Sequence, residues 1–200
     1  MIVVKRDIYV SDGKYFLVKF SDEEKENYMK LMFPENNTSE FYKQEENREL
    51  FWSVICNLEE MDYSIYDAVG EYCGNLELKK IDTATPEIGI NLLEDYRNKG
   101  IATRVIKMLA KKYYEENANI EYYVLKVSSY NLHSRHVIEK MGAELVCQEE
   151  TLLQKATRIA QEKLGINKVQ KECQMDYGLN LEEQEEVVYR YHLLPNVFLK

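Results

Sequence analysis

The sequence predicts a mixed α/β fold in which helices cover a central sheet. Short segments rich in aromatic and β-branched residues, such as Tyr15–Phe20, are typical of strands. In other segments apolar residues recur at helical spacing, as at Ile101, Val105 and Leu109. Segments of the two kinds alternate along the 200 residues, which indicates a sheet with helices packed against it.

The predicted strands are short and are bounded by turn-forming residues. In one of them the apolar Leu76 and Leu78 alternate with charged residues. Because successive side chains of a strand point to opposite faces, Glu77 and Lys79 are expected on the face opposite to these leucines. The predicted strands are Tyr15–Phe20, Tyr63–Asp67, Tyr72–Ile81, Glu87–Leu93, Tyr122–Val127, Leu145–Cys147 and Val187–Leu193.

The predicted helices combine helical spacing with capping signals. Ser21 and Glu24 have the spacing of a capping box, and Pro34 follows the short helix that they open. Gly142 stops a later helix. The predicted helices are Ser21–Phe33, Ser39–Asn57, Gly100–Glu116, Asn131–Lys140 and Leu152–Leu164.

Length and composition fit one domain over residues 1–200, because 45% hydrophobic residues suffice for a single core at this length. A net charge of −9 argues against nucleic acid as a partner. The four cysteines include no CxxC pair, and no apolar stretch has the length of a signal peptide or a membrane span. We therefore expect a cytoplasmic protein without a membrane partner. At about residues 149–186 we expect an inserted helix and an acidic segment.

One stretch, Tyr96–Thr103, has the features of an anion site. Residues 97–112 contain six Lys or Arg and no acid, against the acidic background of the chain. A helix start presents unpaired N–H groups and the positive end of the helix dipole, so Arg97 and Lys99 beside it indicate a bound phosphate. The other four cations are expected to form a solvated helix face: Arg104, Lys107, Lys111 and Lys112.

Three pieces of the sequence together resemble the GNAT N-acetyltransferase superfamily. They are the strand Glu87–Leu93, the Arg-x-x-Gly-x-Ala pattern of Arg97–Ala102 and the helix Asn131–Gly142, in this order. More narrowly, they are similar to the ribosomal-protein alanine N-acetyltransferase-like branch. The resemblance implies a mostly antiparallel central sheet with a splayed strand pair, helices on both faces, and a loop that holds the pyrophosphate of coenzyme A.

The resemblance also implies roles for individual residues. A backbone N–H at Leu93 would polarise the thioester carbonyl. Glu87 matches the strand carboxylate that takes a proton from the amine, with a solvated strand-end residue as the alternative. Asn131 would bind the pantetheine arm, cap its helix, or do both. The cofactor-binding residues implied in this way are Leu92, Leu93, Arg97, Asn98, Lys99, Gly100, Ile101, Ala102, Thr103, Asn131 and Ser134.

These features lead to the hypothesis of an acetyl-CoA-dependent N-acetyltransferase that moves an acetyl group to a primary amine by direct transfer. The acceptor would be a protein N-terminus or a small-molecule amine such as a polyamine, an amino acid or an aminoglycoside. Many family members carry a tyrosine, the proton donor to the thiol, where this sequence has Ile138. The alternative hypothesis is therefore a non-catalytic coenzyme A-binding or sensing module.

No metal is expected as a cofactor. His133 and His136 lie three residues apart on a predicted helix, but the sequence offers no third ligand, and we expect surface histidines. The insertion at about 149–186 is expected to shape the acceptor pocket or a contact with a second copy of the chain, as in a homodimer.

Overall fold

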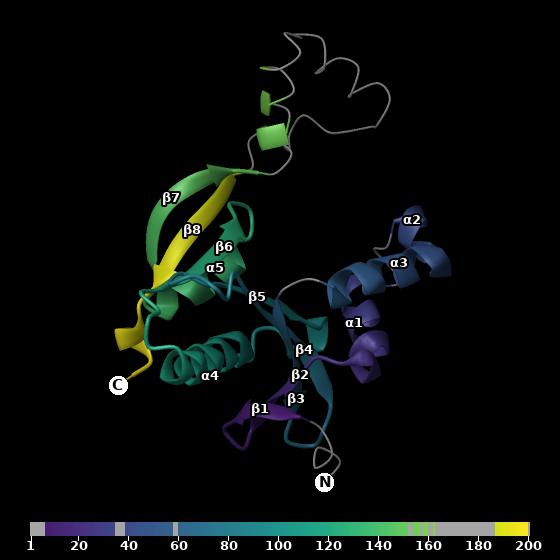
Figure 1. The fold of residues 1–200 in the computed structure, drawn as a ribbon, viewed down its shortest axis with the longest axis horizontal. Helices are drawn as coiled ribbons and strands as arrows, with labels where there is room; N and C mark the ends of the chain where they lie inside the picture. Colours follow the sequence, from purple (N-terminus) through teal and green to yellow (C-terminus); the bar gives the residue numbers. More distant parts are fainter. Residues whose placement is uncertain are drawn as a thin grey trace. The chain divides into compact units, whose positions relative to one another are not determined.

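The computed structural model describes residues 7–34, 39–57, 60–151, 154–156, 158–159, 162 and 187–199. Their eight strands form a mostly antiparallel sheet that is accompanied by helices (Figure 1), which confirms the predicted mixed α/β class. The chain divides into two compact units, residues 1–124 with 193–200, and residues 125–192. No helix among the described residues is long and apolar enough to cross a membrane.

In the first unit five strands pair in chain order, and each is antiparallel to its neighbour. The pairing of β3 with β4 is irregular between Ile65 and Tyr66, whereas β4 and β5 keep one register throughout. These strands are β1 (Ile8–Ser11), β2 (Tyr15–Lys19), β3 (Met61–Asp67), β4 (Tyr72–Lys79) and β5 (Glu87–Leu92).

One face of these strands is apolar and packs against α4 (Ile101–Glu116). The helix presents an apolar stripe at helical spacing, and Val105 and Leu109 are completely buried. The strand residues that share this face are buried as well: Leu17, Ile65, Leu76, Leu78 and Ile88. The burial of this stripe is the main apolar contribution of α4 to stability.

The opposite face lies beneath α1 (Lys25–Met32) and α3 (Glu45–Cys56). It combines a hydrophobic cluster around Val18 and Tyr72 with a polar part around Asn75. Tyr66 connects this face to the first helical segment, because its hydroxyl donates to Glu24 and accepts from the Asn27 amide, 3.3 Å away. Glu77 lies on this face, as its alternation with Leu76 and Leu78 predicted. Helices therefore cover both faces of these strands.

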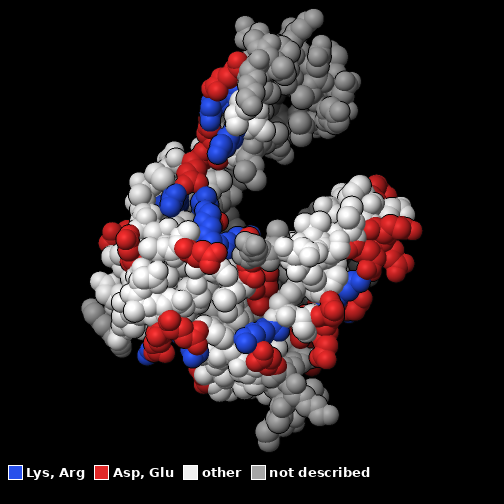
Figure 2. All heavy atoms as spheres, in the orientation of Figure 1, with Lys and Arg blue, Asp and Glu red and all other residues white. Residues whose placement is uncertain are grey.

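The surface of α1–α3 is acidic. Figure 2 shows that Asp and Glu outnumber Lys and Arg over these helices. The exposed acids are Asp22, Glu23, Glu26, Glu40, Glu45, Glu46 and Glu49.

Two local predictions in this region are wrong. The predicted helix Ser39–Asn57 is two helices, α2 (Glu40–Lys43) and α3, because Gln44 between them has extended backbone. The bend allows Tyr42 to stack on Phe33, with ring centroids 4.3 Å apart. The predicted capping box also fails, since the Ser21 side chain caps nothing and the Glu24 side chain turns inward to Tyr66.

The second unit contains most of β6 (Tyr123–Ser128), α5 (Leu132–Lys140), β7 (Glu144–Glu150) and β8 (Val187–Leu193). Strands β7 and β8 are antiparallel. Most of the predicted insertion, including most of the predicted helix Leu152–Leu164, lies outside the described residues. The prediction of a single domain stays a prediction.

Gly74 controls how closely β4 and β5 approach. It has a φ of +157°, and a Cβ added there would lie 2.1 Å from the backbone oxygen of Asn91. A backbone atom of a paired strand cannot move aside as a flexible side chain can. The pairing of Gly74 with Leu92 therefore requires glycine.

We expect Gly74→Ala to lower the free energy of unfolding by about 3 kcal/mol, because the methyl group forces the strands apart. Gly13→Ala is the matched control, since Gly13 also has positive φ (+81°) but no atom within 4 Å of the added Cβ. The control should lose only about 1–2 kcal/mol from its backbone conformation. Urea denaturation measures both values, and equal losses would contradict the role of the strand contact.

Candidate functional site

The loop after β5 prepares the start of α4. A 3-10 helix, Glu94–Tyr96, follows the strand, and the Arg97 N–H closes it on the Glu94 oxygen at 3.1 Å. Asn98 and Gly100 then adopt left-handed backbone, with φ of +61° and +72°. Gly100 is the N-cap of α4 and places no side chain over the helix end. A left-handed N-cap favours glycine, so the local sequence explains the shape of this loop.

The loop presents a row of backbone donors. In the part of the chain that the structure describes, the N–H groups of residues 98–103 have no backbone or side-chain acceptor. The first turn of α4 contains no acidic residue that would offset the positive end of its dipole. A Cβ built on Gly100 would meet no atom within 4 Å, so the space in front of these donors is open. This arrangement suits an anion with several oxygens.

Two cations flank these donors. The Arg97 Nε donates to the Leu92 carbonyl oxygen at 3.1 Å, which ties the side chain to the end of β5. The Lys99 ammonium lies 5.4 Å from the ring centroid of Tyr96. Both side chains are exposed, and neither forms an ion pair with a described carboxylate. They are thus available to an anionic ligand.

The basic residues farther along α4 differ from these two. Arg104 pairs with Asp12, and the guanidinium lies over the Tyr15 ring. Lys112 pairs with Glu116 at 2.8 Å. These contacts belong to the helix surface, in agreement with the expectation that the later cations are structural.

The register of β4 and β5 decides which way the backbone groups of β5 point. The Leu93 N–H donates to the Cys73 oxygen at 3.0 Å, and so it points toward β4. Because the direction alternates along a strand, the N–H of Leu92 points to the other edge. The Pro86 oxygen, on that same edge, accepts from the Val124 N–H at 2.8 Å, which agrees with this alternation. The Leu92 N–H, and not the Leu93 N–H, therefore points away from β4. The role of the Leu93 N–H as a donor to the thioester oxygen stays a prediction.

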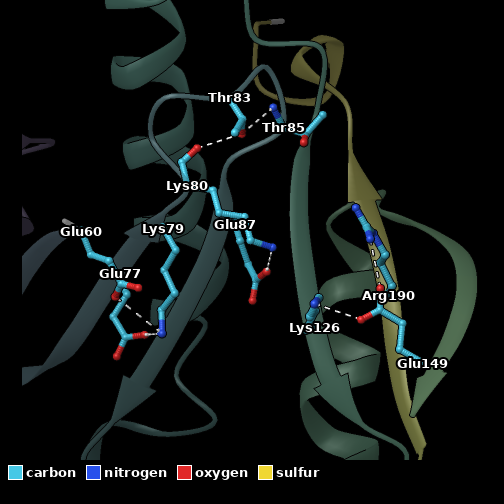
Figure 3. Close-up of polar contacts among 10 residues, drawn as sticks. All are labelled: Glu60, Glu77, Lys79, Lys80, Thr83, Thr85, Glu87, Lys126, Glu149 and Arg190. Carbon is cyan, nitrogen blue, oxygen red and sulfur yellow. Dashed lines mark hydrogen bonds and ion pairs between the residues drawn. The ribbon is translucent and has the colours of Figure 1, made fainter. Parts of the chain in front are cut away.

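Glu87 lies at the opposite end of β5. Its carboxylate pairs with the Lys80 ammonium at 3.1 Å and is 19% exposed (Figure 3). Five residue steps separate Glu87 from Leu92, or about 17 Å along the strand. The structure does not bring the Glu87 side chain to the loop, and its catalytic role stays a prediction.

Polar groups gather between Glu87 and the loop, on the face beneath α1 and α3. Asp62 and Glu77 are directly opposite each other in the pairing of β3 with β4. The Asn75 amide donates to Asp62 Oδ1 at 3.1 Å. Lys79 lies 2.9 Å from Glu77 and 3.8 Å from Glu60 (Figure 3). Burial raises the pKa of Asp62 to about 6, and the negative charges of Glu77 and Glu60 add to the rise.

Sequence reasoning missed this cluster. The alternation of Glu77 with leucines did indicate a polar face on β4. It could not show that β3 places Asp62 opposite Glu77, since that depends on strand register.

The remaining predicted site residues belong to the second unit. Asn131 caps α5, with its Oδ1 accepting from the Ser134 N–H at 3.0 Å. This confirms the prediction that Asn131 caps its helix. Its binding of the pantetheine arm stays a prediction. Ile138 is 7% exposed and packs as a core residue. No group of His, Cys, Asp and Glu among the described residues could hold a metal ion.

Comparison with protein families shows which family the chain belongs to. The family model described as acetyltransferase (GNAT) domain matches residues 9–144. The chain belongs to this family. Membership in the GNAT family makes the protein an acyltransferase, and it does not distinguish the predicted alanine N-acetyltransferase-like branch. No curated protein matches the sequence.

Solved GNAT structures share the fold. One is a chimera of spermidine N-acetyltransferase SpeG from Vibrio cholerae and hSSAT, with a TM-score of 0.64 and 16% identity over 93% of this chain and 98% of that chain. Another is the dodecameric structure of spermidine N-acetyltransferase from Vibrio cholerae in an intermediate state, with a TM-score of 0.62 and 17% identity over 94% and 98%. At these identities the likeness shows the fold alone.

The pKa of Asp62 predicts a pH dependence of stability. The folded protein keeps a proton on Asp62 up to about pH 6, whereas the ordinary value is 3.8. Between these values the folded state binds more protons than the unfolded state, so the free energy of unfolding falls as pH rises. Asp62→Asn removes this fall. Between about pH 4 and about pH 6, the free energy of unfolding of the variant should therefore rise relative to that of the wild type by roughly 1 kcal/mol. Above pH 6 this difference should stay constant.

Urea titrations at a series of pH values measure this difference. Parallel stability curves for the wild type and Asp62→Asn would show that Asp62 titrates normally.

Proposed function

We propose that this GNAT protein is an acetyl-CoA-dependent N-acetyltransferase that transfers acetyl directly to a primary amine. The observation that supports this most is the row of N–H groups at residues 98–103, which have no acceptor among the described residues and are flanked by two cations. Coenzyme A carries a pyrophosphate, which has the charge and the oxygens that such a loop binds.

The residues of the loop would hold coenzyme A by its phosphates. The N–H groups from Asn98 to Thr103 would donate to pyrophosphate oxygens, and Arg97 and Lys99 would supply charge. Leu92 and Leu93 are proposed along the pantetheine arm, together with Asn131 and Ser134. When bound, acetyl-CoA supplies the acetyl group as an activated thioester.

Transfer forms a C–N bond to the amine and breaks the C–S bond of the thioester. The amine loses a proton and the departing thiolate gains one, so both a base and an acid are needed. Glu87 is the proposed base, acting through water because of its distance from Leu92. With isoleucine at 138, the thiolate would receive its proton from solvent. The Leu92 N–H, which points to the edge of β5 away from β4, is a proposed donor to the thioester oxygen.

The acceptor is a small-molecule amine or a protein N-terminus. Structures with this fold include spermidine N-acetyltransferases, which favours a polyamine among the small molecules. The acidic surface over α1–α3 would attract such a cation. A cytoplasmic location and a homodimer complete the proposal.

Thiol release from acetyl-CoA tests the reaction. The amines to compare are spermidine, amino acids, an aminoglycoside and peptides with free N-termini. We expect turnover with at least one of them, and fastest with spermidine. Coenzyme A binding without turnover on any amine would instead support the non-catalytic module.

Gly100 offers an isosteric test of the loop. Asn and Asp have the same shape and both tolerate left-handed backbone, and nothing crowds a side chain there. Gly100→Asp places a negative charge beside the proposed pyrophosphate, and it should weaken coenzyme A binding at least tenfold more than Gly100→Asn. Calorimetric titration with coenzyme A measures both. Equal affinities of the two variants would contradict a phosphate at this loop.

A further inference from the structure

The polar part of the face beneath α1 and α3 carries more negative charge than its cation neutralises. Asp62, Glu77 and Glu60 provide three carboxylates around the single ammonium of Lys79. When all are ionised, two negative charges are left. Burial makes this excess costly, since charges are poorly screened away from water.

Buried acceptors behind these carboxylates add to the excess. Asn75 is 0% exposed, and its amide faces Asp62 because the nitrogen donates to that carboxylate. The amide oxygen Oδ1 has no partner among the described residues. The hydroxyl oxygen of Ser64, opposite Asn75 in the register and also 0% exposed, likewise has none in that part of the chain. Unsatisfied buried polar groups are rare, and that of Asn75 belongs to a side chain in direct contact with Asp62.

The missing group is a cation with hydrogen-bond donors. The described carboxylates do not converge on one point as ligands of a metal ion do. An alkylammonium group has three N–H donors and a positive charge, so it can contact two separate carboxylates. Asp62 and Glu77 are only partly buried.

Gly89 of β5 leaves room for the Glu77 carboxylate. A Cβ added to Gly89 would lie 2.9 Å from Glu77 Oε2, so the carboxylate rests over bare backbone. Gly89 is three residues from Leu92, or about 10 Å along the strand. Under the proposed function, acetyl transfer takes place near Leu92. An ammonium at Glu77 would therefore be a second one, at a distance from the amine that reacts.

We propose that Asp62 and Glu77, backed by Asn75, form an ammonium subsite that selects acceptors with two or more amines separated by a flexible chain. The inference rests on the proposed function and adds to it the residues that recognise the acceptor. A diamine or triamine can reach both this subsite and the end of β5. An amino acid with an uncharged side chain has one ammonium and a carboxylate, and cannot.

Ionisation of Asp62 couples the subsite to pH. The ammonium binds the carboxylate form, so affinity should fall as pH drops below about 6. The other titratable groups near Asp62 come from both strands and both helices. They are Glu60 and Glu77, Lys79, Tyr63 and Tyr72 from the strands, Tyr28 from α1, and Cys56 from α3. Burial raises the pKa values of Tyr28 and Cys56, so both stay neutral below pH 8.

Calorimetric titration of the full chain with spermidine, without acetyl-CoA, tests the subsite. Asp62→Asn and Glu77→Gln should each raise the Kd for spermidine roughly tenfold or more, because each removes a charged hydrogen-bond acceptor. Coenzyme A binding should not change. Glu121→Gln is the matched control, since it removes one negative charge from an exposed position outside the cluster and should bind spermidine as the wild type does.

The kinetic readout is a split between acceptors. Asp62→Asn and Glu77→Gln should each raise KM for spermidine. Neither should change kcat/KM for a simple alkyl monoamine. Wild-type affinity in both folded variants, or no spermidine binding by the wild type, would overturn the subsite. If spermidine binds through Asp62 and Glu77 but no acetyl group is transferred, the subsite stands and the proposed function fails. If spermidine is acetylated equally by all variants, the function stands and the subsite fails.

Discussion

The close antiparallel pairing of β4 with β5 governs the geometry of the candidate site. Gly74 makes it possible, because any side chain there would collide with the backbone of β5. The pairing turns the Leu93 N–H toward β4 and the Leu92 N–H away from it. It also sets the point at which β5 ends and the loop before α4 begins.

The same pairing separates the two faces of the sheet. Leu76 and Leu78 of β4 pack toward α4, whereas Glu77 between them lies with Asp62 on the face beneath α1 and α3. The apolar side packs against α4, whose N-terminus is the proposed anion site. The polar side offers carboxylates to a cation. One strand thus supports two opposite electrostatic environments, which suits an enzyme that brings an anionic cosubstrate and a cationic acceptor together.

Asp62 illustrates a conflict between stability and recognition. A partly buried carboxylate beside two others destabilises the folded state once it ionises, as its raised pKa shows. A neutral residue would be better for stability alone. Binding of an ammonium would offset the repulsion, so the proposed ligand provides a physical reason for the arrangement.

The sequence by itself determined the α/β class, most strands and helices, and the place of the Gly100 loop, with its two cations, at the start of α4. These depend on side-chain periodicity and backbone preferences within a few residues. Even so, the helical spacing of 39–57 did not reveal the break at Gln44, where the extended backbone lets Tyr42 pack on Phe33. The sequence also did not reveal that the Glu24 carboxylate is buried and accepts a hydrogen bond from Tyr66, so that it does not form the predicted cap.

Only the tertiary structure decided which groups meet across strands. Asp62 and Glu77 are fifteen residues apart in the chain, and no local signal places them opposite each other. Likewise, the direction of the Leu93 N–H follows from its pairing with Cys73 and not from its own sequence context. Strand register is a non-local property set by core packing and by the contact at Gly74. A shift of one residue would exchange the faces and the edges on which the site is built.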